Sequence, residues 1–199
     1  MFSILYYLPI VLCIAASGAR IVEMKRKRDV VSGKVQENFT FRLFVVVGAI
    51  MTVGSIAEYV LCGGIFSPRF SWIAFVAGIV SSIVSFKLRW AAIAALGKFW
   101  SLHVEIRDNH EFVQSGPFRF VRHPTYFSMI LENASFPLFC SAWYMLILIP
   151  IAYIPALILR LRLEEPAMVE KFGDAYREYQ RRVPMLIPYK WPSKWRSAL

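Results

Sequence analysis

Charged residues are scarce in this chain. Only 18% of its 199 residues are charged, whereas 57% are hydrophobic. A soluble domain of this size does not carry so much apolar surface, so the composition indicates an integral membrane protein. The net charge of +10 does not point to nucleic acid, because the basic residues occur as short clusters between apolar runs. We expect these clusters to face an anionic lipid leaflet, with no nucleic acid as partner.

Several common signatures are also missing. The three cysteines, Cys13, Cys62 and Cys140, lie in apolar runs without CxxC spacing, which excludes a zinc knuckle and a disulfide framework. No Gly-x-Ser-x-Gly elbow occurs, so a serine hydrolase is excluded. The first apolar run has no basic stretch before it and no small-residue cleavage site, so we expect a retained span and not a signal peptide.

The apolar runs predict about five transmembrane helices in an all-α membrane protein. The first three are expected at about residues 1–19, 41–62 and 70–96. They form an N-terminal part, residues 1–95, whose first two helices are joined by a basic cytosolic loop. Residues 126–159 are too long for one crossing and contain three prolines, so we expect a hairpin of two short helices with its tip at Pro137–Ser141. In the third span, small residues at four-residue spacing predict close helix packing: Ala74, Gly78 and Ser82.

Two further segments complete the chain. Residues 97–124 are polar and predict a loop, with a short strand-like piece at Ser101–Ile106. After Arg160 we expect an amphipathic helix that starts afresh with Pro166 in its first turn. On a five-span layout, 22 of the 23 lysines and arginines lie on one side, which by the positive-inside rule is the cytosolic side. The loop and the C-terminal helix are therefore expected in the cytosol.

The final hairpin should bring two charged clusters to one depth in the membrane. Its start carries His123 and Tyr126, and its end carries Arg160 and Glu164. These four residues supply a hydrogen-bond donor, an aromatic ring, a cation and an anion, which suits a zwitterionic ligand beside an apolar one. Glu164 needs a cationic partner, either Arg160 four residues earlier or a ligand ammonium. The alternative is that each residue only extends toward the lipid headgroups.

All three histidines, His103, His110 and His123, fall within the polar segment and its end. Their separations of seven and thirteen residues match no helical pair of metal ligands. We therefore expect no metal site.

From Leu96 onward the chain carries an ordered series of motifs. They are Leu96-Gly97 with Trp100-Ser101, His110 to Val113, Gly116-Pro117-Phe118, Arg122-His123-Pro124-Thr125-Tyr126, Arg160, Glu164-Glu165, Phe172-Gly173-Asp174-x-Tyr176-x-x-Tyr179, and Arg182-Val183-Pro184 with Pro188. Together they resemble the isoprenylcysteine carboxyl methyltransferase family, within a wider group of membrane methyltransferases that includes phospholipid N-methyltransferases. The resemblance covers nearly half of the chain and implies that residues 96–199 are the methyltransferase core.

The resemblance implies a site for S-adenosylmethionine (SAM), with S-adenosylhomocysteine (SAH) as product, and no Rossmann domain. By position in the motifs, Arg160 would face the methyl acceptor as the catalytic and substrate-binding residue, and Glu164 would receive the cofactor ammonium. The other cofactor contacts would be Glu105, His110, Glu111, Phe112, Val113, Phe118, His123, Pro124, Thr125 and Tyr126. Phe118 stands where many relatives have tyrosine, so ring stacking is retained there and a hydroxyl hydrogen bond is lost.

Three functions remain open from the sequence. The first is SAM-dependent methyl transfer to a lipid-like acceptor in the bilayer, most simply the carboxylate of a prenylated cysteine. The second is transfer to a phospholipid or other lipid amine, which the cation of Arg160 disfavours but a lipid phosphate would tolerate. The third is a non-enzymatic membrane protein in which the charged clusters are only helix ends.

Overall fold

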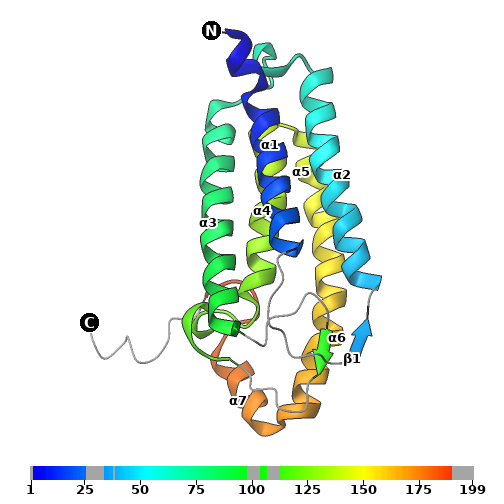
Figure 1. Ribbon diagram of the computed structural model, residues 1–199, viewed down its shortest axis with the longest axis vertical. Helices are drawn as coiled ribbons and strands as arrows, with labels where there is room; N and C mark the ends of the chain where they lie inside the picture. The colour runs from blue at the N-terminus through cyan, green and yellow to red at the C-terminus, as the bar shows by residue number, and fades with distance from the viewer. Residues whose placement is uncertain (1, 26–33, 38, 98–103, 107–112, 190–199) are drawn as a thin grey trace, which may run out of the picture.

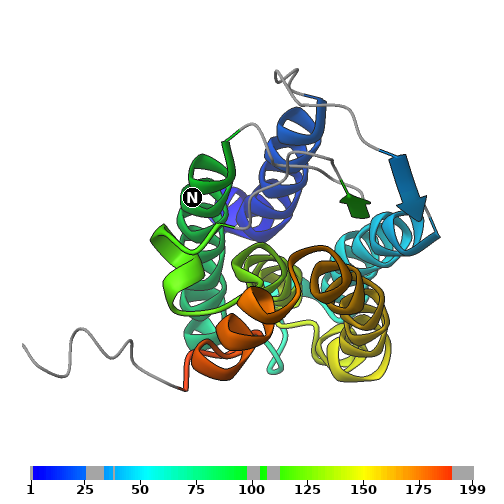
Figure 2. The same cartoon turned by 90° about the horizontal axis from the view of Figure 1, so that it is seen from below.

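The computed structural model describes residues 2–25, 34–37, 39–97, 104–106 and 113–189 as a bundle of long helices (Figure 1). Its helices are α1 (Phe2–Lys25), α2 (Phe39–Leu61), α3 (Trp72–Leu96), α4 (Pro124–Cys140), α5 (Trp143–Leu148), α6 (Ile154–Phe172) and α7 (Asp174–Arg182), with short 3-10 turns at Gly64–Phe66 and Gly116–Arg119. Seen from below, α4 lies in the middle of the bundle, with the other long helices around it (Figure 2). The predicted class, an all-α membrane protein, is confirmed.

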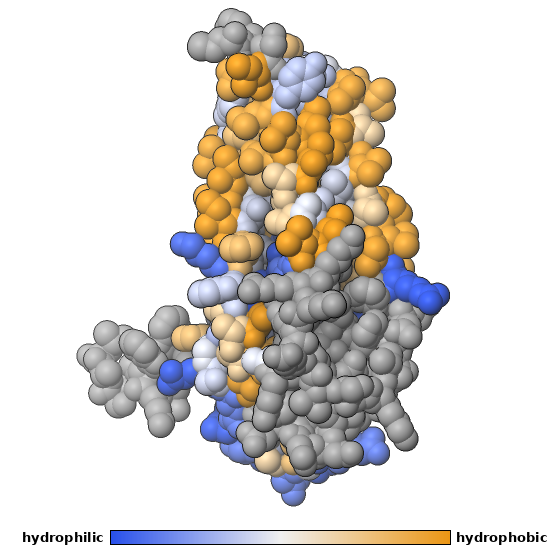
Figure 3. Space-filling view, in the orientation of Figure 1, coloured by the Kyte–Doolittle hydropathy of each residue, from blue (hydrophilic) through white to orange (hydrophobic). Residues whose placement is uncertain are grey.

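Four helical stretches are long and apolar enough to cross a membrane: Ile4–Glu23, Arg42–Leu61, Trp72–Leu96 and Trp143–Phe172. The remaining predicted span, the first arm of the hairpin, corresponds to α4, which has only 17 residues. Apolar side chains cover the helical part of the visible surface, and hydrophilic ones gather at the α7 end (Figure 3). The exact number of crossings therefore stays a prediction.

The final hairpin differs from expectation in its second arm. The turn falls at Ser141–Ala142, where Ser141 has a φ of 50°, so the tip lies at the end of the predicted segment. The second arm is not short, because α5 continues through a π-helical turn, Ile149–Tyr153, directly into α6. Pro150 lies inside this continuous stretch and has no backbone N–H to donate, and a proline and a π-helical turn are both usual causes of a local departure from regular helix geometry.

The predicted start of the C-terminal helix at Pro166 is wrong. Helix α6 runs through Pro166 to Phe172, because a proline removes only one backbone hydrogen bond, the one to the carbonyl of Arg162. The helix ends at Gly173 instead, whose φ of 57° and ψ of −133° suit glycine. The amphipathic helix is the shorter α7, which begins at Asp174.

A small sheet accompanies the helices. Strand β1 (Lys34–Glu37) pairs antiparallel with β2 (Val104–Ile106), which lies within the predicted strand-like piece. Residues 101–103 of that piece lie outside the described residues. The sheet connects the segment between α1 and α2 with the polar segment that follows α3.

Helix α3 packs closely on α4, as the small residues predict. A Cβ atom on Gly78 would lie 2.9 Å from Phe139 Cδ1 and 3.0 Å from its backbone nitrogen, so only glycine fits there. Two serines of α3 also donate to carbonyl oxygens of α4, Ser81 to Leu131 at 2.8 Å and Ser85 to Ser128 at 2.7 Å. These contacts fix the depth at which α4 presents its first turn.

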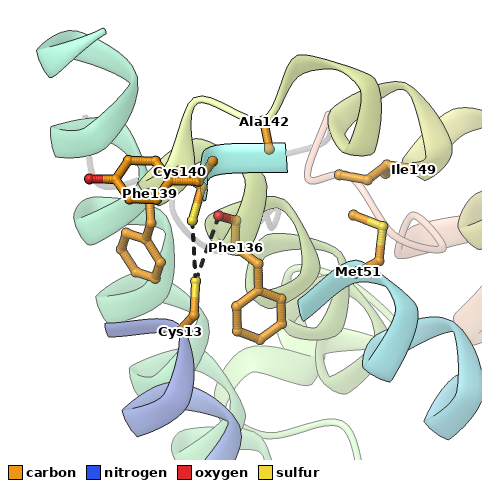
Figure 4. Packing of buried hydrophobic residues seen from close by; sticks show 8 residues of the cluster. Cys13, Met51, Phe136, Phe139, Cys140, Ala142 and Ile149 are labelled. Atoms are coloured by element: carbon orange, nitrogen blue, oxygen red, sulfur yellow. Dashed lines mark hydrogen bonds between the residues drawn. The ribbon is translucent and has the colours of Figure 1, made fainter. Parts of the chain in front are cut away.

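Near the hairpin tip, side chains from α1, α2 and α4 form a buried cluster with Ala142 and Ile149, which flank α5 (Figure 4). The thiols of Cys13 and Cys140 lie 3.7 Å apart within it. The hydroxyl of Tyr59 donates to the Tyr6 carbonyl at 2.8 Å and so links α2 to α1 at this end. The cluster holds the ends of these helices together without contributing charged groups.

A charged network lies inside the bundle, and sequence reasoning missed it. Arg89 of α3 pairs with Glu132 of α4 and, at 2.9 Å, with Glu23 of α1, which also pairs with Arg20 at 3.0 Å. Arg89 and Glu132 are only 5% and 7% exposed. We call these four residues the Arg89 network. It joins three helices through ion pairs that balance two positive charges with two negative ones.

Glu58 of α2 caps the N-terminus of α5. Its carboxylate accepts hydrogen bonds from the backbone N–H groups of Tyr144 and Met145, each at 3.1 Å. We expect Glu58→Ala to lower the free energy of unfolding by about 1 kcal/mol, as loss of a helix cap generally does. Thermal unfolding in detergent measures this, and Glu58→Gln is the control because it keeps one acceptor oxygen. A loss as large in Glu58→Gln as in Glu58→Ala would contradict the capping role.

Candidate active site at the base of the hairpin

The two charged clusters of the hairpin meet, as predicted. His123 Nδ1 lies 3.8 Å from a carboxylate oxygen of Glu164, and the Tyr126 hydroxyl donates to the other oxygen. Arg160 Nε donates to the Tyr126 oxygen at 2.7 Å. We call these four residues the Glu164 site. Two segments that are far apart in the chain therefore share one small site at the α7 end of the bundle.

Local backbone structure explains how α4 presents this site. His123 immediately precedes α4, and Pro124 occupies its first turn, where a proline favours helix initiation. The backbone N–H groups of Arg122 and His123 donate to the carbonyls of Pro184 and Met185, at 2.9 and 3.1 Å. The segment that follows α7 thus fixes the position of the histidine.

Helix α6 supplies the other two residues of the Glu164 site. Arg160 and Glu164 are four residues apart and so lie on one face of the helix. Arg160 is only 4% exposed, and its guanidinium lies over the rings of Phe44 and Tyr126, at 5.9 and 5.8 Å from their centroids. Phe44, from α2, was not predicted as a site residue. A buried cation beside two aromatic rings is shielded from water, which strengthens its attraction for an anion.

Glu165 is the residue of this region that sequence reasoning undervalued. Its carboxylate accepts from Arg122 Nε at 2.8 Å, from His123 Nε2 at 2.9 Å and from Gln180 Nε2 at 2.6 Å. Because a carboxylate only accepts, His123 carries its proton on Nε2 and turns Nδ1 toward Glu164. The adjacent pair of acidic residues was the available signal. Glu165 orients the histidine, while Glu164 faces the site.

Helix α7 closes this end of the molecule. The Tyr179 hydroxyl donates to the backbone carbonyl of Phe118 at 2.7 Å, and the Phe118 side chain is buried. Burial raises the pKa of Tyr179 and of Tyr176 above the ordinary value, so both phenols stay protonated. Arg122 also donates to the carbonyls of Gln180 and Val183, at 3.0 and 2.6 Å. The helix is thus tied to both sides of the site.

Only some of the remaining predicted cofactor residues lie near His123 or within the described residues. Pro124 and Thr125 begin α4 beside His123, and Val113 lies half-buried before the 3-10 turn that contains Phe118. Glu105 belongs to β2. His110, Glu111 and Phe112 lie outside the described residues, so their expected roles stay predictions. Among the residues that the structure does describe, no group of three or more potential metal ligands occurs.

Residues 76–170 match the isoprenylcysteine carboxyl methyltransferase (ICMT) family. Over this segment the chain is similar to the ICMT family. The matched residues include all four members of the Glu164 site and end within α6.

Individual relatives match parts of the chain. The Bacillus subtilis protein YpbQ is 32% identical over 94 residues, which are 47% of this chain and 56% of that protein. Methanethiol S-methyltransferase 1 of Bradyrhizobium diazoefficiens is 34% identical over 73 residues, or 37% of this chain and 25% of the relative. Protein-S-isoprenylcysteine O-methyltransferase of Schizosaccharomyces pombe is 28% identical over 103 residues, or 51% and 44%. The chain thus matches between a quarter and about half of the length of these relatives.

Proposed function

We propose that this ICMT-family chain transfers the methyl group of SAM to a lipid-like acceptor in the membrane, most simply the carboxylate of a prenylated cysteine. The observation that carries the proposal is the convergence of His123, Tyr126, Arg160 and Glu164. We place the site at the cytosolic face, because 22 of the 23 basic residues lie on that side of the predicted layout. Residues 96–199 would form the catalytic core.

The Glu164 site fits the amino-acid end of the cofactor. The Glu164 oxygens contact the Tyr126 hydroxyl and the His123 ring, and 27% of the side chain remains exposed. The carboxylate therefore retains room for a cation from outside, and the ammonium of SAM would be its ion-pair partner. The cofactor would supply a methyl group bound to a positively charged sulfur. The acceptor would take this methyl group by in-line displacement, and SAH would be released.

The chain's own residues would align the reactants. A carboxylate acceptor is already ionised at neutral pH, so no general base is required. Arg160 would hold this carboxylate by a charge-assisted hydrogen bond, and its two covering rings would exclude water. Alignment and desolvation would then provide most of the acceleration.

A second acceptor class has support from the relatives, some of which are named methanethiol S-methyltransferases. An acceptor thiol would need no cation to hold it. A lipid amine is the third acceptor class, and Arg160 would repel its charged form.

An assay with radiolabelled SAM and purified protein separates the three acceptor classes, with an S-farnesylcysteine analogue, methanethiol and phosphatidylethanolamine as acceptors. Methylation of phosphatidylethanolamine alone would refute the carboxylate assignment, and absence of SAH binding in detergent and in nanodiscs would favour a non-enzymatic protein.

The role of Arg160 gives a quantitative prediction. We expect Arg160→Gln to reduce kcat/KM for the farnesylcysteine analogue by about 10- to 100-fold, the usual cost of one hydrogen bond to a charged group. SAH affinity should stay within about threefold, because Arg160 faces the acceptor. Arg177→Gln is the control, since Arg177 is exposed on α7 and pairs only with Asp174 among the described residues. Equal loss of SAH affinity and turnover would contradict the acceptor role.

A further inference from the structure

All three cysteines of the chain lie near the hairpin tip. Cys13 belongs to α1, Cys62 directly follows α2 and Cys140 ends α4, and all three are free thiols. Cys13 Sγ lies 3.7 Å from Cys140 Sγ (Figure 4). These two residues are 127 positions apart, so no spacing in the sequence indicates that they meet. Tertiary packing alone creates this pair of thiols.

The distance between the two sulfurs suits a disulfide. A disulfide bond is about 2.05 Å long, so each sulfur would move by about 0.8 Å from the present separation of 3.7 Å. Cys13 is 0% exposed and Cys140 is 3% exposed, and Met51, Phe136 and Phe139 belong to the same buried cluster. The surrounding side chains keep the sulfurs in contact. The alternative is that both cysteines only pack as small hydrophobic residues, which is common for buried free cysteine.

A small cavity at the tip gives access to one of the two thiols. It is lined by Cys62 and Cys140, and also by Arg69. Arg69 is exposed, and its Nη1 lies 3.9 Å from Cys62 Sγ. The cavity therefore lies between the exposed surface and Cys140, whereas Cys13 does not line it. An external reagent would thus meet Cys140 before Cys13.

The pair lies at the end of the bundle that is predicted to face away from the cytosol. On the predicted layout, that side carries only one of the 23 lysines and arginines, Arg69. Disulfides form and persist in oxidising compartments outside the cytosol. His123 precedes α4 and Cys140 ends it, so this 17-residue helix separates the thiols from the Glu164 site by about 25 Å. Chemistry at the thiols is therefore separate from chemistry at the Glu164 site.

We propose that Cys13 and Cys140 form a reversible disulfide that links α1 to α4 covalently. The inference goes beyond the proposed methyl transfer and does not depend on it. The oxidant is an external organic disulfide. The Cys140 thiolate attacks one of its sulfurs and releases the first thiolate, and the Cys13 sulfur then attacks the Cys140 sulfur of the mixed disulfide and releases the second. The two protons of the protein thiols pass to the two released thiolates, so one disulfide is reduced as the other forms.

The bond would strengthen the attachment of α1 at this end of the bundle. Here α1 is otherwise held by a hydrogen bond from Tyr59 to the Tyr6 carbonyl and by the contact between the Ser17 and Thr52 hydroxyls at 3.3 Å. Each neutral hydrogen bond contributes little on its own. A disulfide across 127 positions would constrain the unfolded chain, and the expected stabilisation grows with the length of the loop.

Counting free thiols gives the first test. Cys62→Ser removes the exposed thiol, and the purified full-length variant is treated with oxidised glutathione, unfolded with N-ethylmaleimide and weighed by intact mass spectrometry. We expect no maleimide and no glutathione adduct, against two maleimides after dithiothreitol. Cys13→Ser in the same background should trap one glutathione on Cys140, because the second step is blocked. Two maleimides on the oxidised Cys62→Ser protein, or a stable glutathione adduct on it, would overturn the proposal.

Thermal unfolding in detergent gives the second test. We expect the oxidised Cys62→Ser protein to have a Tm about 5 °C or more above that of the same protein after dithiothreitol. The matched control is the double variant with Cys13→Ser, whose Tm should be the same after both treatments. Equal Tm values for the two forms of Cys62→Ser would show that no bond links the helices and would overturn the proposal.

Discussion

Glu164→Ala protein is expected to bind SAH about 100-fold more weakly than wild-type protein while unfolding at nearly the same temperature. The variant loses the carboxylate that we assign to the cofactor ammonium. A 100-fold change corresponds to about 2.7 kcal/mol, within the range for a hydrogen bond between charged groups. Stability should change little, because the side chain is 27% exposed and contacts only Tyr126 and His123 among the described residues.

Isothermal titration with SAH measures the affinity, and thermal unfolding in the same detergent checks the fold. Glu178→Ala is the control, because Glu178 is an exposed acidic residue on α7 that pairs with Arg181 and Arg182. We expect it to bind SAH normally, since exposed ion pairs contribute little. Unchanged affinity in Glu164→Ala would remove Glu164 from the proposed site.

Replacement of the neighbouring Glu165 should instead destabilise the protein. Glu165→Ala leaves the buried ring of His123 and the part-buried groups of Arg122 and Gln180 without their acceptor. Breaking a buried ion pair from one side costs about 3–5 kcal/mol, so a large drop in Tm is expected. SAH binding should weaken too, because His123 and the segment after α7 lose their fixed positions.

Thermal unfolding with and without SAH distinguishes this role from that of Glu164. Glu165→Gln is the informative control, since its amide oxygen still accepts from Arg122 while the charge is gone. We expect an intermediate Tm for this variant. A Glu165→Ala protein with the Tm of wild-type protein would refute the positioning role, whatever its activity.

The residues of the Glu164 site were predictable because their signals are local. Charges at the two ends of one hairpin must lie at the same end of the bundle, so His123 and Glu164 were expected to meet. The residue pattern alone did not show which of Glu164 and Glu165 faces the site, and only the family resemblance favoured Glu164. Adjacent helical residues point about 100° apart, and only the packing of α7 decides which of them faces the site.

Ion pairs between residues that are distant in the sequence could not be predicted from the sequence. Arg89 and Glu132 are separated by 43 residues, and each looks like an ordinary charge near the end of an apolar run. The end of α6 was misplaced for a related reason: proline is a strong local signal, but the helix continues past Pro166 and ends at Gly173. Local rules predicted the hairpin and its turn, and a second local signal, Gly173, marks where its second arm ends.

The Arg89 network has a consequence for how the chain enters the membrane. Placing one charged side chain in the hydrocarbon costs about 2.5–3.5 kcal/mol during insertion. Arg89 leaves the ribosome 66 residues after Glu23 and 43 residues before Glu132, so its first available counter-charge is on α1. We therefore expect α1 to supply the first counter-charge to Arg89 as the bundle assembles, and α4 to complete the neutralisation afterwards. Helix packing and membrane insertion would then be coupled, because α1 contributes the residue that pairs with Arg89 of α3.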